Sequence, residues 1–82
     1  MKKNILLIDD DEELLDELGE VLRAEGYEVQ TAETGSRAME LADREPFAVA
    51  LADIKLPDMD GVYLTGKLME AQPELCCLLM TA

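Results

Sequence analysis

Histidine is absent from the 82-residue sequence, and this absence excludes several kinds of chemistry. Without histidine the chain cannot supply an imidazole base, a phosphohistidine or an imidazole ligand for a metal. Any metal that the chain binds is therefore expected to be held by oxygen atoms, the ligands that hard cations take.

Basic side chains are scarce as well. Seven lysines and arginines stand against 19 aspartates and glutamates, which gives a net charge of -12. A chain this acidic repels phosphate backbones and anionic lipid. We therefore expect no direct nucleic-acid binding and no membrane partner.

Long apolar runs are missing, although 49% of the residues are apolar. No run approaches the roughly 20 residues of a spanning helix, and the apolar part of MKKNILLIDDD is too short for a signal peptide. Cys76 and Cys77 are adjacent in an apolar run, so they fit neither a CxxC redox pair nor a disulfide framework, and we expect buried free thiols. The sequence thus predicts one cytoplasmic domain over residues 1–82.

Short apolar runs alternate with segments of helical periodicity. The runs predicted to form strands are residues 4–9, 27–32, 47–53 and 75–80. The segments predicted to form helices are residues 11–26, with a C-terminal cap at Gly26, 37–44, and 60–72, between the N-cap Asp60 and Pro73. In the last helix, the residues expected to face inward are Val62, Leu64, Leu68 and Met69.

The order of these elements, β-α-β-α-β-α-β, predicts a parallel sheet with helices on both faces. The second strand alternates polar and apolar residues, so we place it at an edge of the sheet with one face in water. The carboxyl ends of all strands lie at one edge of a parallel sheet. Functional groups of such proteins gather at that edge.

Aspartates follow two of the predicted strands directly: Asp9 and Asp10 close the first, and Asp53 closes the third. If these strands are neighbours, about 4.8 Å apart, the three carboxylates meet at one edge. Like charges raise one another's pKa unless a cation offsets them, and Mg²⁺ suits a site made of oxygen ligands. A carboxylate beside a metal can attack phosphorus, which would give an aspartyl phosphate. Thr81, at the end of the fourth strand, offers a hydroxyl to an anionic oxygen.

Other interpretations fit these residues less well. Any one of the aspartates, taken alone, could equally be a turn or capping residue. Asp9-Asp10-Asp11 has the D-x-D spacing of a haloacid-dehalogenase-type phosphatase, but Glu12 and Glu13 follow where that class usually has Thr or Val. A flavodoxin-like flavin binder needs a Ser/Thr/Gly-rich phosphate loop after the first strand, and the acids found there would expel a phosphate.

The sequence resembles the receiver domain of two-component response regulators. ILLIDDDEELL matches the acidic signature of the first strand, and Asp53, Pro57 and Gly61 match the pattern D-x-x-x-P-x-x-x-G. MTA at residues 80–82 matches the switch motif of the fourth strand. The resemblance implies a flavodoxin-like α/β fold whose four strands have the order 2-1-3-4, part of the order 2-1-3-4-5 known for chemotaxis receivers.

The resemblance also implies roles for single residues. Asp53 would be the phosphoacceptor, and the phosphate would come from a histidine kinase or a phosphotransfer protein. The implied ligands of Mg²⁺, for which Mn²⁺ or Ca²⁺ could substitute, are Asp9, Asp10, Asp53 and the backbone carbonyl of Lys55. Thr81 would be the switch hydroxyl. The chain would then be no ordinary enzyme but a phosphorelay protein that catalyses its own phosphorylation.

The family domain also has a fifth strand, two further helices and a lysine after the fifth strand, and these 82 residues contain none of them. We therefore interpret the chain as a truncated receiver, (βα)3β. Its fourth strand is apolar on both faces and is expected to form an exposed edge. We therefore expect the chain to assemble as a homodimer or higher homo-oligomer, by pairing of this edge or by exchange of an element between chains. An alternative function follows, a non-phosphorylatable interaction protein or engineered half-domain whose main property is assembly.

Overall fold

In a computed structural model of the chain, which describes residues 3–80, strands and helices alternate as the sequence predicts. The strands are β1 (Asn4–Ile8), β2 (Glu28–Ala32), β3 (Val49–Asp53) and β4 (Cys76–Met80). The helices are α1 (Glu12–Ala24), α2 (Gly35–Arg44) and α3 (Gly61–Ala71). The predicted bounds are shifted by one or two residues. Within the described residues, no helix combines the length and the apolar character that crossing a membrane requires.

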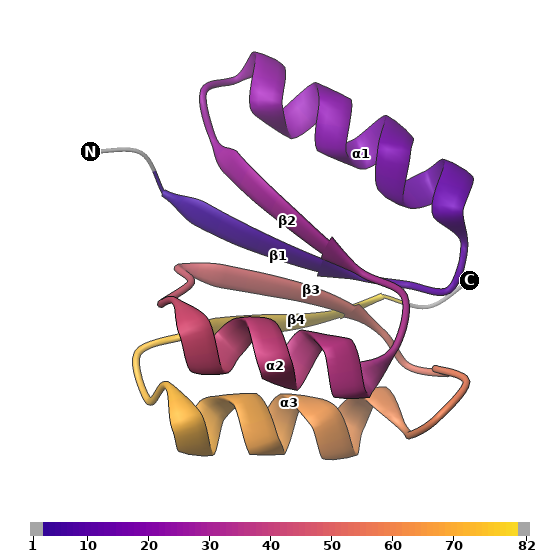
Figure 1. Ribbon diagram of the computed structural model, residues 1–82, viewed down its shortest axis with the longest axis vertical. Helices are drawn as coiled ribbons and strands as arrows, with labels where there is room; N and C mark the ends of the chain where they lie inside the picture. Colours follow the sequence, from indigo (N-terminus) through magenta and orange to yellow (C-terminus); the bar gives the residue numbers. More distant parts are fainter. Residues whose placement is uncertain (1–2, 81–82) are drawn as a thin grey trace.

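The strands form one parallel sheet in the order β2-β1-β3-β4. α1 lies on one face of this sheet, and α2 and α3 lie on the other (Figure 1). The flavodoxin-like fold with strand order 2-1-3-4 is therefore confirmed. β2 is an edge strand whose buried and exposed residues are interspersed, as its alternating sequence predicted.

The sheet divides the hydrophobic core into two layers of unequal size. The larger layer lies toward α2 and α3 and includes the fully buried Leu6, Leu64 and Leu68. The smaller layer lies toward α1 and includes Leu7 and Leu15. Leu6 and Leu7 belong to different layers because successive residues of a strand point to opposite faces. Full burial of side chains of this size stabilises the fold by about 1.5–3 kcal/mol each.

Each helix begins at a side-chain cap near the carboxyl ends of the strands. The caps are Asp11, Thr34 and Asp60, whose oxygens accept hydrogen bonds from backbone N–H groups of the first turn at 3.2, 3.1 and 2.6 Å. Such caps satisfy donors that the helix itself leaves without a partner. After α1, Gly26 adopts a φ of 97°, the left-handed conformation that glycine tolerates at a helix end.

α3 faces the core with a different stripe from the one predicted. Leu64 and Leu68 are buried as expected, but Val62 is 57% and Met69 is 48% exposed. Each residue advances a helix by about 100°, so Val62 lies about 200° from Leu64 and points away from the sheet. Thr65 occupies the inward stripe instead, and its hydroxyl donates to the Val62 carbonyl at 2.9 Å. The inward orientation predicted for Val62 and Met69 was wrong.

β4 forms the second edge of the sheet, because it pairs with β3 on one side and ends the strand order on the other. Leu78 and Leu79 are 50% and 43% exposed, so the predicted exposed apolar edge is present. Cys76 is exposed and Cys77 is half-buried. The prediction that both thiols are buried was therefore wrong, because it relied on the apolar run around them, and this run forms an edge strand.

Candidate functional site

The carboxylates of Asp9, Asp10 and Asp53 come together where β1 and β3 end. One oxygen of each carboxylate lies within 4.8 Å of the others. The reason is the pairing of β1 directly with β3, which continues to Ile8 opposite Ala52 and brings the residues that follow side by side. The juxtaposition inferred from the strand order is therefore found in the structure. We call this group the carboxylate cluster.

The members of the carboxylate cluster differ in burial. Asp9 is 5% exposed, Asp53 is half-buried and Asp10 is exposed. Burial raises the pKa of Asp9, and the neighbouring charges of Asp53 and Asp10 raise it further. The backbone N–H of Asp11, which donates to Asp9 Oδ1 at 3.0 Å, opposes these effects but does not cancel them. The repulsion within the cluster is of the kind that a bound cation relieves.

The donor atoms of the carboxylate cluster fit a hard divalent cation, because all are oxygens. The backbone N–H of Lys55 donates to Asp53 Oδ1 at 3.2 Å and so orients this carboxylate. The ion pairs of residues 3–80 are Arg37 with Glu40 and Lys67 with Glu70, so among these residues the Lys55 ammonium forms no ion pair with the cluster. Thr81 lies outside the described residues.

The loop of residues 54–60 connects Asp53 to α3 and is tightly closed. The N–H of Gly61 donates to the carbonyl of Ile54 at 2.6 Å. A Cβ atom at position 61 would overlap the carbonyl oxygen of Asp53 and would lie 2.9 Å from Ile54 Cα. Only glycine permits this approach of α3 to the end of β3, which explains the glycine of the D-x-x-x-P-x-x-x-G pattern in physical terms.

The structure adds Asp58, which sequence reasoning missed. Its Oδ1 accepts from the N–H of Gly35 at 2.9 Å, and its Oδ2 accepts from the N–H and the Oγ of Ser36 at 2.9 and 2.8 Å. These donors, the N–H of Gly35 first among them, hold the pKa of Asp58 below its usual value. The partners lie 22 and 23 residues away in the sequence, so no local pattern announces the contact.

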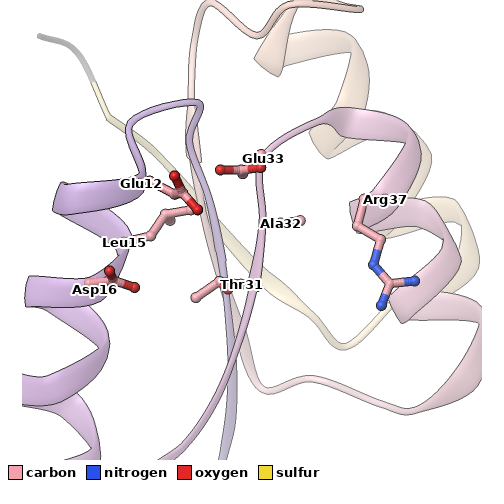
Figure 2. Close-up of a pocket in the computed structure, with 7 residues that line it drawn as sticks. All are labelled: Glu12, Leu15, Asp16, Thr31, Ala32, Glu33 and Arg37. Atoms are coloured by element: carbon pink, nitrogen blue, oxygen red, sulfur yellow. The ribbon is translucent and has the colours of Figure 1, made fainter.

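A cleft of about 290 Å³ lies between α1, the end of β2 and the start of α2. Its lining consists of Glu12, Leu15, Asp16, Thr31, Ala32, Glu33 and Arg37. Figure 2 shows Glu12 and Asp16 extending from α1 and Arg37 extending from α2. The cleft does not include the carboxylate cluster, and its excess of carboxylates disfavours an anionic ligand.

A parallel sheet of order 2-1-3-4 with acidic residues at its carboxyl edge defines a CheY-like fold of the flavodoxin type. The chain matches the response regulator receiver domain family over residues 5–82. It belongs to this family. The resemblance inferred from the sequence is thereby confirmed.

Individual relatives agree with this assignment. The chain is 37% identical over 79 residues to the transcriptional regulatory protein GlrR of Escherichia coli (strain K12), and the match covers 96% of this chain and 18% of GlrR. Its structure resembles a CheY-like receiver domain protein from Methanospirillum hungatei JF-1 with a TM-score of 0.96 and 40% identity, over 99% of this chain and 65% of that one.

A second solved structure is similar over nearly the whole length of this chain. It is a response regulator protein from Burkholderia pseudomallei with a phosphorylated aspartic acid, a calcium ion and citrate. The TM-score is 0.92 and the identity 34%, over 98% of this chain and 47% of that one. The present chain therefore spans only part of the length of the relatives that it matches.

Proposed function

We propose that residues 1–82 act as one receiver module of two-component signalling, which accepts a phosphoryl group on Asp53. The donor is a histidine kinase or a phosphotransfer protein. The observation that carries the proposal is the carboxylate cluster, with its three oxygens within 4.8 Å at the carboxyl edge of the sheet. Membership in the receiver family supports the class of reaction, as does the phosphorylated aspartic acid in the Burkholderia pseudomallei protein.

Mg²⁺ is the cation proposed for this site, and Mn²⁺ or Ca²⁺ would substitute for it. The proposed ligands are Asp9, Asp10, Asp53 and the backbone carbonyl of Lys55. A divalent ion bound there offsets negative charge on the transferring phosphoryl group. The all-oxygen donor set of the cluster and the calcium ion of the Burkholderia pseudomallei relative support this part of the proposal.

The proposed chemical step belongs to the Asp53 carboxylate. Oδ1 accepts the N–H of Lys55 at 3.2 Å, which leaves Oδ2 as the oxygen that attacks phosphorus. The new bond joins this oxygen to phosphorus, while the bond from phosphorus to the donor nitrogen breaks and its electron pair leaves with the donor. Thr81 is the proposed switch hydroxyl, which would then donate to a phosphoryl oxygen. The chain regulates by its own modification and does not turn over a separate substrate.

Phosphoacceptance is tested by intact mass after incubation with a small-molecule phosphodonor and Mg²⁺. We expect one phosphoryl adduct on the wild-type chain, and none in the Asp53→Asn variant or in a sample with chelator. An adduct that persisted in Asp53→Asn would show that another residue accepts the phosphate. A wild-type chain without any adduct would contradict the proposal and favour the assembly function instead.

Assembly remains a second candidate because a specific surface favours it. Among residues 3–80 no strand pairs with the outer side of β4, and Leu78 and Leu79 of this strand are each more than two-fifths exposed. Exposed apolar edges of this kind pair with other strands. We infer that the chain forms a homodimer or higher homo-oligomer through β4, with or without phosphorylation.

Self-association is expected to strengthen as salt rises, because salt screens the repulsion between chains of net charge -12.

Leu78→Lys should weaken the dimer by about tenfold or more, since it removes a leucine whose burial in the interface contributes about 1.5–3 kcal/mol. The added lysine reduces the net negative charge, so greater overall repulsion would not explain the loss. Val21→Lys, at a 61% exposed position of α1, is the matched control and should leave the dimer intact. A monomer at every salt concentration in sedimentation equilibrium would contradict the inference.

A further inference from the structure

Asp58 connects the loop of residues 54–60 to the first turn of α2. The first N–H groups of a helix have no partner within the helix. In α2, Thr34 satisfies the N–H of Arg37 at 3.1 Å, while Asp58 satisfies those of Gly35 and Ser36 at 2.9 Å each. The start of α2 is therefore capped by two side chains, one of its own and one from the loop after β3.

Apolar packing supports the same connection. Met59 lies directly against Gly35, where a Cβ atom would stand 2.6 Å from the methionine Cγ. A side chain larger than hydrogen at position 35 would displace Met59. Asp58 and Met59 thus fasten one part of the loop to α2 by hydrogen bonds and by close contact.

The two ends of the loop are fastened to each other, directly after β3. Gly61 donates to the carbonyl of Ile54 at 2.6 Å, and Lys55 forms an antiparallel bridge with Asp60. The segment that follows the proposed phosphoacceptor is therefore held at two places. The hydrogen bonds of Asp58 must break before the loop can leave α2.

A carboxylate is well suited to this contact. The first turn of a helix carries a partial positive charge, which favours an anion at that place. Because Asp58 accepts three hydrogen bonds from two successive residues, it fixes both the distance and the orientation of the loop. A single contact at the surface would leave the loop free to rotate.

We propose that Asp58 is a positioning residue, which fastens the 54–60 loop to α2 and thereby holds Asp53 and the Lys55 carbonyl ready for a divalent cation. This inference rests on the proposed function and extends it. The affinity for the cation then depends on a residue that belongs to neither the proposed ligand set nor the phosphoacceptor. A loop that is ordered beforehand does not have to be ordered on binding, so the ion binds more tightly.

The first test compares Mn²⁺ affinity, measured from the electron paramagnetic resonance signal of free Mn²⁺, in two alanine variants. Asp58→Ala is expected to bind about tenfold more weakly than wild type, the lower end of the range for residues that orient metal ligands from outside. Thr34→Ala also removes a cap of α2 but no hydrogen bond to the loop, and it should bind within about twofold of wild type. Asp58→Asn, which retains one acceptor oxygen, should lie between.

The second test is amide hydrogen exchange in the metal-free protein. The N–H of Gly61, and that of Leu56, which donates to the Met59 carbonyl at 3.2 Å, should exchange about tenfold faster in Asp58→Ala than in Thr34→Ala. Equal exchange in the two variants, or an equal loss of Mn²⁺ affinity, would overturn the inference. If wild type bound no Mn²⁺, the metal part of the proposed function would fail, and the exchange rates alone would decide whether Asp58 positions the loop.

Discussion

Replacing Gly61 with alanine is expected to destabilise the protein by about 3 kcal/mol, the upper part of the usual range for overpacking. The new methyl group would overlap the Asp53 carbonyl oxygen and lie 2.9 Å from Ile54 Cα. Both atoms belong to the backbone, so no side chain can rotate away to make room. In a domain of this size the melting temperature should fall by more than about 10 °C, as measured by circular dichroism.

Gly66 provides the matched control in the same helix. It is exposed, and a Cβ atom there would meet nothing within 4 Å. Gly66→Ala should therefore stabilise the protein by about 0.5–1 kcal/mol, since alanine favours the helix and restricts the unfolded chain. The same chemical change is expected to have opposite signs five residues apart. Equal effects at the two positions would contradict the close approach of Gly61 to β3.

Replacing Asp9 with asparagine is expected to reverse the order of stability between metal-free and metal-bound conditions. The oxygens of the carboxylate cluster lie within 4.8 Å of one another. Each such pair repels by about 1 kcal/mol in a dielectric like water and by about 3 kcal/mol at an effective value of 20. Without metal, Asp9→Asn removes part of this repulsion and should unfold at a higher denaturant concentration than wild type.

With Mg²⁺, wild type should be more stable than Asp9→Asn. A ligand at 100 times its Kd stabilises a folded protein by about 2.7 kcal/mol, and the wild-type chain should gain this amount. Asp9→Asn has lost a proposed ligand and should gain much less. Asp43→Asn, at an exposed position of α2, is the control and should gain as much as wild type. An Mg²⁺ response in Asp9→Asn equal to that of wild type would show that Asp9 does not bind the ion.

The pH dependence of the metal-free protein follows from the same carboxyl group. Burial, followed by the charges of neighbouring aspartates, raises the pKa of Asp9 in the folded protein. A group with a raised pKa binds its proton more tightly when folded, so its contribution to stability is present below the unfolded value of about 3.9 and is lost as the pH rises through the folded pKa. The advantage of Asp9→Asn over wild type should therefore grow as the pH rises through this window. An advantage that is the same at all pH values would contradict this account.

The juxtaposition of the carboxylates could be predicted from the sequence because it depends on a general rule. Asp9, Asp10 and Asp53 each follow an apolar run, and parallel strands place their carboxyl ends at one edge. Neighbouring positions of the first and third strands are sufficient to bring the three side chains together. The rule needs no knowledge of how individual side chains pack.

The features that sequence reasoning missed depend on contacts between distant segments. The rotation of α3 is set by the approach of Gly61 to Asp53, and apolar spacing alone did not show that Val62 points outward. Cys76 stands in an apolar run, which indicates burial, but it is exposed because its strand, β4, lies at the edge of the sheet. An aspartate in a loop, such as Asp58, is an ordinary turn residue by sequence. Its role as a cap of α2 is evident only once the fold places α2 beside the loop.

The side-chain caps of the helices have a consequence for how a partner approaches. Because Asp11 and Asp60 begin α1 and α3, and Asp58 holds the start of α2, carboxylates concentrate at the same edge as the carboxylate cluster. These carboxylates surround the proposed phosphoacceptor in a chain whose net charge is -12. A basic partner would be attracted before contact, so its association rate should fall as ionic strength rises, whereas an acidic partner would be repelled.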